Sequence, residues 1–450
     1  MASLTADLGR FVAELSLEAI PEEGRAIAKS GIVDCFGVMV AGSREAVVGL
    51  VDREMAGSDG TLASLVPSGA WRNIEDAALV NGVAAHVLDY DDVTLDGHPS
   101  AVLVPAILAQ GEASGSSGAE MLTAYIAGYE VWAELLVREP VPLHQKGWHP
   151  TCVRGTVAAA AACASLRRLD AQQTANALSI AASMSAGLVA NFGSMTKAFQ
   201  VGRAAQSGLI AARLAEAGLT AAPDALEHPT GFLVAFSPTG KPLDLPFDPA
   251  QKQWHIVRQG LNLKRYPICY ATHRAIDGTL ALMERHKLKP EDIERIRVAT
   301  SETQMLMLRN HRPRTGLEAK FSMEFAMASA IVAGKVGLSE VTDSFVAKPE
   351  VQALFPRVSA ETSKDATADS AFAPFDVVEI ATSDGSRLKG DEVRYAKGSH
   401  QRPLSRDELW QKFADCLGAG YSESAKARAF ERLNAFERLG GTQDLALSAQ

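Results

Sequence analysis

A run of 26 residues without a charged side chain, Ala171 to Thr196, most constrains how this chain can fold. Gln, Asn and Ser recur along the run, and a bilayer would disfavour them, so we expect this run to form a buried helix and not a membrane span. A second segment, Gly155 to Leu166, is largely alanine, and Ala175 to Leu188 is rich in Ala and Ser. Small side chains let helices approach closely. We therefore expect these two segments to form buried helices at the centre of a helical domain.

An apolar stripe predicts another helix near the N-terminus. Its members follow the spacing i, i+3, i+4, i+7, i+8 of one helical face: Ile32, Cys35, Phe36, Met39 and Val40. Gly42 stands where a glycine that ends a helix is expected. The tail from Ser405 to Leu439 has the charged amphipathic pattern of further helices.

Strand patterns begin after about Pro267. Residues 293–298 alternate apolar and charged side chains, and residues 376–382 lead through Ser383-Asp384-Gly385, a hairpin turn, into Arg387-Leu388. A helix is expected between them, from Phe321 to Val336. We therefore predict a mainly α protein. It has a large all-helical domain (residues 1–267, completed by C-terminal helices in 396–450) and a smaller α/β (α+β) domain (268–395).

Composition limits the function. The chain has 450 residues, 47% hydrophobic and 22% charged, and a net charge of −9 from 44 basic and 53 acidic residues. This balance gives no overall basic field, so we expect no nucleic-acid partner and no membrane partner. The five cysteines form no CxxC pair and lack the clustered spacing of iron–sulfur ligands. With no apolar leader at the N-terminus, we expect a cytoplasmic protein with reduced thiols.

The densest polar cluster lies in residues 81–100. Its candidate chemical groups are His86, Asp89, Asp91, Asp92 and His98. Three interpretations stay open: caps of neighbouring helices (with Asp96 and Ser100 as further candidates), a metal site, or a proton-transfer centre in which a carboxylate fixes an imidazole. A cap needs one aspartate, so capping alone is disfavoured.

Three further segments carry candidate groups. His149 precedes Pro150, as His98 precedes Pro99, and each His-Pro pair opens an apolar helix. Lys197 is the first charge after the uncharged run, and a buried ammonium is costly unless an anion meets it. Arg203 follows it, and the segment Lys264-Arg265-Tyr266-Pro267 adds a second cationic pair at the predicted domain junction.

These groups favour acid–base chemistry on a small carboxylate. The sequence has no GxSxG elbow, Walker loop or GxGxxG motif, so serine hydrolysis, phosphoryl transfer and nicotinamide redox chemistry lose support. Proton removal beside a carboxylate builds negative charge, which ammonium groups stabilise in the transition state. Histidine can act as base or acid near neutral pH.

At these segments the chain resembles the MmgE/PrpD family, whose members include 2-methylcitrate dehydratase, cis-aconitate decarboxylase and iminodisuccinate epimerase. The matching stretches are NGVAAHVLDYDD with GHPSAVLVPA, GWHPTCVRGTVAAAAA, ALSIAASMSAGL with GSMTKAFQVGRAA, LKRYPICYATHRAIDG, and EAKFSMEFAMASA. The resemblance implies a large helical domain, a smaller α/β lid domain, a pocket between them, a homodimer, and chemistry on di- or tricarboxylates without a cofactor.

By this similarity the catalytic positions are Asp89, His98, His149, Lys197 and Lys264. We assign both lysines to carboxylate binding, and Asp89 to orienting a histidine or acting as base. The expected substrate contacts are Asp91, Asp92, Arg203, Tyr266, His273 and Phe325. No metal ligands are expected.

Two positions depart from relatives that perform decarboxylation. Those relatives have a tyrosine in an FSxxY motif and a threonine after the aspartate cluster, whereas this chain has Phe325 and Val93, with Thr94 following. Because two hydroxyl donors are missing, decarboxylation of cis-aconitate is the family activity that the sequence favours least. The case for a bulky tricarboxylate such as 2-methylcitrate is weaker for the same reason.

We therefore predict an acid–base enzyme, first a hydro-lyase similar to 2-methylcitrate dehydratase, and alternatively an epimerase of a dicarboxylate such as iminodisuccinate. His98 and His149 could supply acid and base in either reaction. Two other classes stay open: a non-catalytic carboxylate-binding protein, and a metal-dependent hydrolase with ligands His86, Asp89, Asp92 and His98. A helical scaffold protein is favoured least.

Overall fold

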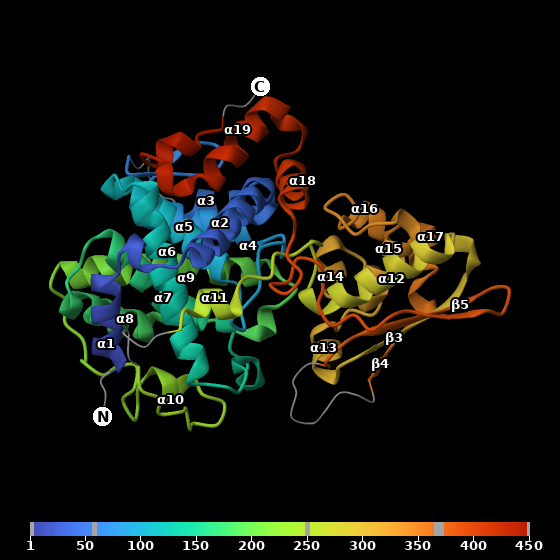
Figure 1. Ribbon diagram of the computed structural model, residues 1–450, viewed down its shortest axis with the longest axis horizontal. Coiled ribbons are helices and arrows are strands. Elements are labelled where there is room, and N and C mark those ends of the chain that lie inside the picture. Colours follow the sequence, from blue (N-terminus) through green and yellow to red (C-terminus); the bar gives the residue numbers. More distant parts are fainter. Residues whose placement is uncertain (1–3, 56–60, 248–252, 364–372, 448–450) are drawn as a thin grey trace. The chain divides into compact units, whose positions relative to one another are not determined.

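The computed structural model describes residues 4–55, 61–247, 253–363 and 373–447 (Figure 1). The chain forms two compact units. The first, here called the helical unit, comprises residues 1–262 and 405–450, and the second, the mixed unit, comprises residues 263–404. The fold is mainly α with a small α/β part, as the sequence predicts.

The helical unit contains one short antiparallel ribbon, β1 (Ala63–Ser64) paired with β2 (Trp71–Arg72). Its α-helices are α1 (Leu4–Glu14), α2 (Glu22–Gly42), α3 (Ala46–Met55), α4 (Ile74–His86), α5 (Pro99–Ser114), α6 (Gly118–Val137), α7 (Pro150–Leu166), α8 (Ala171–Met184), α9 (Met195–Glu216), α10 (Phe232–Phe236), α11 (His255–Gln259), α18 (Arg406–Leu417) and α19 (Glu423–Asn434).

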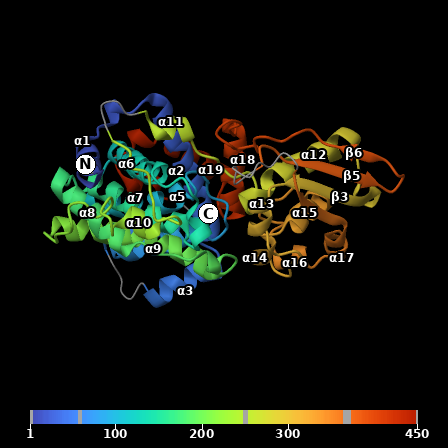
Figure 2. The same ribbon diagram turned by 90° about the horizontal axis from the view of Figure 1, so that it is seen from below.

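Helix α7 is the centre of the helical unit, as its alanine-rich sequence predicts. Every residue of α7 except Ser165 is buried, and the helix packs against α5, α6, α8 and α9 (Figures 1 and 2). A Cβ on Gly208 of α9 would lie 2.5 Å from the Cβ of Ala159 and 2.6 Å from the backbone N of Ala160. The missing side chain therefore allows α9 to lie directly on α7.

The uncharged run is only partly buried, so the expectation of one buried helix was wrong. Helix α8 ends at Met184 and buries a single face, and residues 185–194 form turns and a short 3-10 helix. Leu188 and Met195 are 48% and 45% exposed. Ser185 adopts an extended backbone and ends α8, and Gly187 and Gly193, which have positive φ, interrupt regular structure in the segment that follows. An absence of charge removes only a desolvation cost and does not itself require burial.

The predicted apolar stripe lies in α2, all five of its residues are buried, and the helix ends at Gly42 as expected. Glycine is required at position 42 because α2 packs closely on α4 there. The backbone of Gly42 has no positive φ, but a Cβ there would overlap the carbonyl oxygen of Ala84 in α4. Gly42 therefore fixes the contact between α2 and α4.

A buried ion pair joins the C-terminal helices to the rest of the helical unit. Lys412 of α18 lies with its Nζ 2.6 Å from Oδ1 of Asp34 in α2, and both side chains are almost fully buried. The same Nζ donates to the carbonyl oxygen of Tyr90 at 2.8 Å. Lys412 thereby ties α2, α18 and the segment between α4 and α5 together.

The mixed unit is built on a four-stranded sheet of order β4-β3-β5-β6. Strand β3 (Ile293–Thr300) pairs in parallel with β4 (Val358–Thr362) and antiparallel with β5 (Val377–Thr382), which continues into β6 (Arg387–Lys389). The predicted strands and hairpin are confirmed, with Gly385 at a φ of 86° in the turn. Strand β4 was missed because it is a mostly exposed edge strand without an apolar run.

Helices of the mixed unit bury one face of this sheet. They are α12 (His273–His286), α13 (Glu302–Met307), α14 (Gly316–Ala319), α15 (Met323–Ala333), α16 (Asp343–Val346) and α17 (Pro349–Gln352). Helix α12 contacts β5, and α15 contacts β4. Ile293, Ile296 and Val298 of β3 lie in the apolar core, while Arg297 forms ion pairs on the exposed face.

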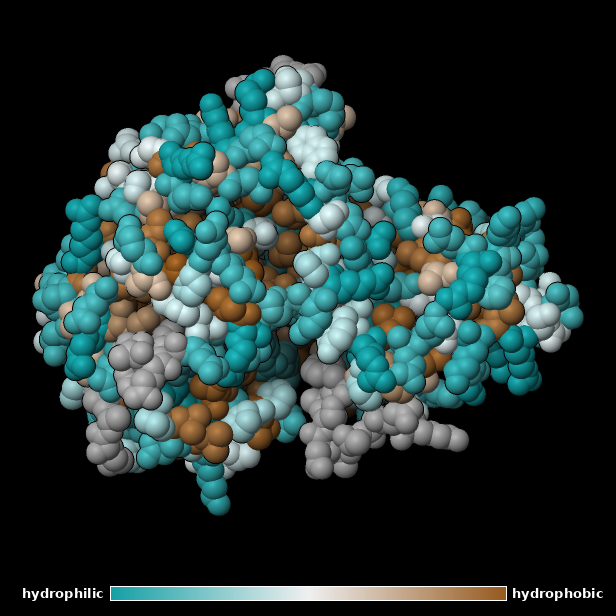
Figure 3. All heavy atoms as spheres, viewed as in Figure 1, coloured by the Kyte–Doolittle hydropathy of each residue, from teal (hydrophilic) through white to brown (hydrophobic). Residues whose placement is uncertain are grey.

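Within the described ranges, no single helix has the length and apolar composition to cross a membrane, although α2 and α3 pass such a test together as a pair bent by 85°. The face in Figure 3 is largely hydrophilic, with a hydrophobic patch over α10.

The Asp34–Lys412 pair gives a stability prediction. Lys412→Met keeps the aliphatic stem but leaves Asp34 as a buried, uncompensated charge, so the free energy of unfolding should fall by about 3–5 kcal/mol. Lys426→Met in α19 is the matched control, because Lys426 is equally buried but pairs with a Glu423 that is 77% exposed. The control should lose less than about 1 kcal/mol. Urea unfolding measures both, and equal losses would contradict the role of the pair.

Candidate active site

Four helix ends supply the polar cluster of the helical unit. His86 is the last residue of α4, and His98 and His149 are the N-cap residues of α5 and α7, each with proline at the first helical position. Lys197 lies in the first turn of α9. Proline suits the first helical position of α5 and α7 because the N–H that it lacks would have no partner within the helix there. The two His-Pro pairs therefore place their imidazoles at helix starts.

Close packing of α4 on α9 helps to position two of these groups. A Cβ on Gly82 would lie 2.7 Å from the Cα of Gly202. Gly82 is about one turn before His86, and Gly202 is five residues after Lys197. Only glycines permit this backbone approach, so the crossing brings the end of α4 near the start of α9.

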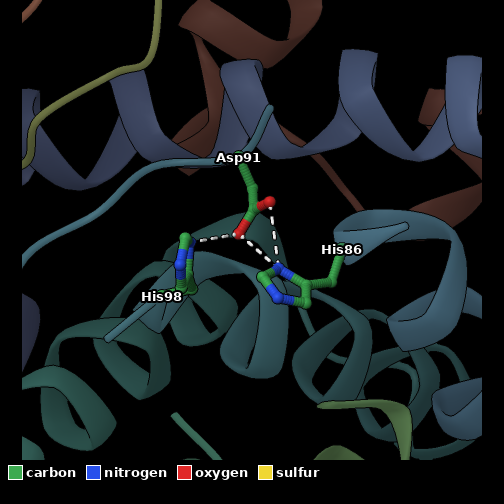
Figure 4. A group of neighbouring side chains, drawn as sticks. All are labelled: His86, Asp91 and His98. Atoms are coloured by element: carbon green, nitrogen blue, oxygen red, sulfur yellow. Dashed lines mark hydrogen bonds and ion pairs between the residues drawn. The ribbon is translucent and has the colours of Figure 1, made fainter. Parts of the chain in front are cut away.

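Asp91 is shared by two imidazoles (Figure 4). Its carboxylate lies 3.0 Å from Nδ1 of His86 and 2.9 Å from Nδ1 of His98. His98 Nδ1 also lies 2.8 Å from the carbonyl oxygen of Asp92. An ionised carboxylate only accepts hydrogen bonds, so both histidines donate through Nδ1–H, and their Nε2 atoms are left for proton transfer.

A third imidazole lies next to this pair. The ring centroids of His86 and His98 are 4.6 Å apart, and those of His86 and His149 are 6.1 Å apart. Nδ1 of His149 lies 2.9 Å from Oε1 of Gln200, a neutral amide. Among the described residues, neither Nε2 of His86 nor Nε2 of His149 has a hydrogen-bond partner.

Lys197 and Asp89 form a buried ion pair beside the imidazoles. The Lys197 ammonium also lies 5.1 Å from the ring centroid of Phe192, which contacts His149 edge-to-face at 4.8 Å. The anion that meets this buried lysine is thus the protein's own carboxylate. The carboxylate that contacts His86 and His98 is Asp91, whereas Asp89 was predicted to orient a histidine or act as base.

Asp92 faces away from the imidazoles. Its carboxyl group accepts from the backbone N–H of Ser100 at 3.2 Å and from the Ser100 hydroxyl, whose oxygen is 2.7 Å from the hydroxyl of Tyr125. Asp92 therefore caps the start of α5 from eight residues away. The capping interpretation holds for this one aspartate of the cluster.

The segment between α4 and α5 adopts an unusual backbone. Asp89, Leu95 and Asp96 all have positive φ, which is costly for residues with a Cβ. Their partners stabilise it: Trp132 donates to the carbonyl of Leu95 at 3.0 Å, and Asp96 pairs with Arg154 at 3.2 Å. The surrounding helices thus determine where the aspartates point.

Burial and charge give neighbouring groups opposite protonation states. Burial, with a smaller effect of Lys197, lowers the pKa of His86 to about 4 and that of His149 well below its usual value. Burial raises the pKa of Asp92 to about 8. Burial would also raise the pKa of Asp91, but its two imidazole partners hold it well below the usual range. At pH 7 Asp91 is ionised and Asp92 is protonated.

This arrangement suits proton transfer on an anion. The buried imidazoles are neutral bases, and helix N-termini carry partial positive charge that favours carboxylates.

Part of the same cluster also has the side chains of a metal site. His86, Asp91 and His98 offer ligand atoms within 4.8 Å of one another. Asp89 and Asp92, proposed from sequence as metal ligands, lie instead with Lys197 and Ser100.

The remaining predicted residues lie elsewhere. Arg203 of α9 hydrogen-bonds Gln206 in its own helix. Four others belong to the mixed unit, and all four are buried: Lys264, Tyr266, His273 and Phe325.

Within the mixed unit, the Tyr266 hydroxyl donates to Asp277 at 2.6 Å, and its ring lies 5.0 Å from that of His273. The ring of Phe325 packs in the apolar core, 6.3 Å from Phe345. Roles in substrate binding stay predictions for these residues.

Sequence reasoning missed several supporting residues. Gln200 holds His149, Phe192 contacts both His149 and Lys197, and Lys412 anchors Tyr90. Asp34 carried a usable signal, because a carboxylate beside Cys35 in an apolar stripe needs a buried cation. Gln200 and Phe192 carried none, since each is a common residue in its local context.

Comparison with known proteins finds matches along most of the chain. The model of the MmgE/PrpD N-terminal domain matches residues 6–243, and that of the MmgE/PrpD C-terminal domain matches residues 266–436. The second match extends beyond the mixed unit into α18 and α19.

Three individual proteins that are similar to this chain have the same name. The chain is 30% identical to a cis-aconitate decarboxylase of Mus musculus over 353 residues, 75% of this chain and 70% of that protein. It is 30% identical to the Homo sapiens protein of the same name over 349 residues, 75% of this chain and 71% of that one. A cis-aconitate decarboxylase of Aspergillus terreus is 24% identical over 459 residues, 94% of this chain and 91% of that protein.

The protonated state of Asp92 predicts a pH dependence of stability. The folded state holds this proton up to about pH 8, whereas an unfolded aspartate releases it near its ordinary pKa of 3.8. Stability from Asp92 is therefore lost as the pH rises between these values, by up to about 1.4 kcal/mol per unit. Between pH 5 and pH 8, the unfolding free energy of Asp92→Asn relative to that of wild type should therefore rise by up to about 1.4 kcal/mol for each pH unit.

Asp96→Asn is the control for this measurement. Burial alone would raise the pKa of Asp96, but His144 and Arg154 lower it, so its carboxylate is already ionised above pH 5. Urea unfolding at several pH values should show no comparable gain for this variant. A flat difference between Asp92→Asn and wild type would contradict the protonated carboxyl.

Proposed function

Because this chain belongs to the MmgE/PrpD family, we propose that it is an acid–base lyase that acts on a small di- or tricarboxylate without a cofactor. One observation carries the proposal. Three imidazoles, two of them paired with one carboxylate and one with a neutral amide, lie beside a buried lysine at the end of α4 and the starts of α5, α7 and α9. A cytoplasmic homodimer is part of the same proposal by family resemblance.

Elimination of water is the first candidate reaction. An imidazole backed by a carboxylate holds a proton more firmly than one backed by an amide. We therefore assign His98, with Asp91, as the acid and His149, with Gln200, as the base. His149 takes the proton beside a substrate carboxylate, the C–H electrons form the alkene, and the departing hydroxide takes the proton of His98 and leaves as water.

Lys197 is proposed to stabilise the charge that builds on the substrate carboxylate as this proton leaves. Asp89 balances the ammonium before substrate binds and holds it in place. Lys264 is proposed as a second carboxylate-binding residue. Epimerisation would use the same imidazoles for proton removal and return, and is the alternative reaction.

Decarboxylation is a second candidate, because the similar proteins of mouse, human and Aspergillus terreus are named cis-aconitate decarboxylases. In that reaction the bond to the departing carboxylate breaks, carbon dioxide leaves, and an acid such as His98 protonates the carbon. The missing hydroxyls at Phe325 and Val93 weigh against it.

A substrate panel in deuterated water separates these reactions. The purified protein is incubated with 2-methylcitrate, citrate, cis-aconitate and iminodisuccinate, and products are followed by NMR and mass spectrometry. Dehydration gives an alkene, decarboxylation gives carbon dioxide, and epimerisation gives deuterium uptake without net conversion. Binding without any turnover would support a carboxylate-binding protein, and turnover lost on chelation would support a metal-dependent enzyme.

Lys197→Ala tests the proposed charge stabilisation. Turnover should fall by about 100-fold or more, because the developing negative charge loses its ammonium partner. Lys29→Ala is the control, since Lys29 pairs with Glu437 through partly exposed side chains and has no proposed part in the chemistry. Steady-state kinetics and circular dichroism measure activity and fold. A folded Lys197→Ala variant with near-normal turnover would remove Lys197 from the site.

A further inference from the structure

The ring of Phe192 contacts two of the side chains to which the proposed reaction gives a part. The Lys197 ammonium lies 5.1 Å from the centroid of this ring, and the imidazole of His149 meets it edge-to-face at 4.8 Å. The ring of His144 meets it at 6.1 Å, with an angle of 79° between the two planes. A phenylalanine side chain neither donates nor accepts an ordinary hydrogen bond, so this half-buried ring is an apolar surface among polar groups.

The segment that carries Phe192 is attached to both helices whose starts supply these groups. Two backbone hydrogen bonds, each 3.0 Å long, join residues 187–189 to residues 147–149, just before α7. Nε2 of Gln200 in α9 donates to the carbonyl oxygen of Leu188 at 3.3 Å. The position of the Phe192 ring is therefore set relative to α7 and to α9 alike.

The proposed reaction determines where a substrate carbon lies relative to this ring. Lys197 holds a substrate carboxylate, and His149 removes a hydrogen from the carbon that bears this carboxylate. That carbon therefore lies between the ammonium and the imidazole, each of which Phe192 contacts. A further substituent on the same carbon then packs against the ring.

An apolar surface in this place distinguishes substituents by their polarity. A methyl group that packs on the ring is removed from water, which is favourable. A hydroxyl group in the same place loses its hydrogen bonds to water and gains none from the ring. His144, the third polar neighbour of the ring, already lies with its Nδ1 3.3 Å from Oδ1 of Asp96. A polar substituent at this carbon therefore loses binding free energy.

We propose that Phe192 is a specificity-determining residue whose ring selects carboxylates with hydrogen or a small alkyl group, and not a hydroxyl group, on the reacting carbon. This inference rests on the proposed function, because that reaction places the carbon between Lys197 and His149. It deepens the proposed function by naming the class of substrate. It concerns groups within the helical unit alone.

The test measures the binding of three dicarboxylates: succinate, meso-2,3-dimethylsuccinate and meso-tartrate. They differ only in the substituents on their two central carbons, which are hydrogen, methyl and hydroxyl. Because both central carbons carry the same substituent, the ligand presents it to Phe192 whichever carboxylate meets Lys197. Isothermal titration calorimetry on the full chain gives each Kd. Wild type should bind dimethylsuccinate about 10-fold or more tighter than tartrate, with succinate between them.

Three variants change the ring in different ways. Phe192→Ala removes it, so the preference for dimethylsuccinate over tartrate should fall by about 10-fold. Phe192→Leu keeps an apolar surface and should keep the wild-type order. Phe192→Gln supplies an amide that can bond a hydroxyl group, so tartrate should become the tighter ligand. Phe236→Ala is the matched control, because Phe236 is also half-buried but packs on Trp148, with ring centroids 5.0 Å apart. The control should leave the order unchanged.

Three outcomes would overturn the inference. They are an equal loss of affinity for all three ligands in Phe192→Ala, tightest binding of tartrate by wild type, and no binding of any of the three at millimolar concentration. An equal loss would make the ring only a support for Lys197.

The inference can be decided even if Phe192→Ala does not fold, since Phe192→Leu must keep the order and Phe192→Gln must reverse it. Binding needs no turnover. Absence of turnover on the substrate panel would therefore count against the proposed function and leave the binding order intact, whereas turnover on the panel with the wrong binding order would overturn this inference alone.

Discussion

Four carboxylates are buried in and beside the segment between α4 and α5, and the rest of the site depends on how each is compensated. An unpaired buried charge costs several kcal/mol, and a buried neutral carboxyl group also loses stability without hydrogen bonds, so each of the four requires a specific partner. The partners come from different parts of the helical unit: Lys412 for Asp34, Lys197 for Asp89, two imidazoles for Asp91, and Ser100 for Asp92. These pairings fix a segment whose backbone is otherwise strained.

The same pairings divide the chemistry among adjacent residues. Asp91 and Asp92 are neighbours in the chain and equally buried, but one lies with two imidazoles and the other with a hydroxyl and a backbone N–H. Their pKa values therefore move apart in opposite directions. Such divergence is how proteins assign acid and base roles to like groups. Here it gives one carboxylate that orients histidines and one that acts as a neutral cap.

Periodicity predicted much of the fold, because it reports which face of an element is buried. The stripe of α2, the alternation of β3 and the hairpin after β5 were predicted correctly on this ground. His-Pro pairs also predicted the starts of α5 and α7, since proline fixes the first helical residue. The uncharged run misled, because its helix already ends at Met184 and no local pattern reports how much of the remainder is covered by other segments.

The choice between Asp89 and Asp91 could not be predicted in this way. Both are aspartates two residues apart, and their partners come from elements distant in the sequence: Asp89 meets Lys197 of α9, whereas Asp91 meets His86 and His98. Sequence pattern gave the residue types of the site, and tertiary contacts decided which aspartate meets Lys197 and which meets the imidazoles.

Charge balance adds a final constraint on any anionic ligand of the helical unit. At pH 7 the cluster contains one cation, Lys197, two anions, Asp89 and Asp91, and neutral Asp92, His86 and His149. A carboxylate that approaches these groups raises their affinity for protons, because it adds negative charge in a poorly solvated place. A carboxylate ligand therefore meets neutral imidazoles at His86 and His149, and Lys197, already paired with Asp89, is the one ammonium in this cluster that can attract it.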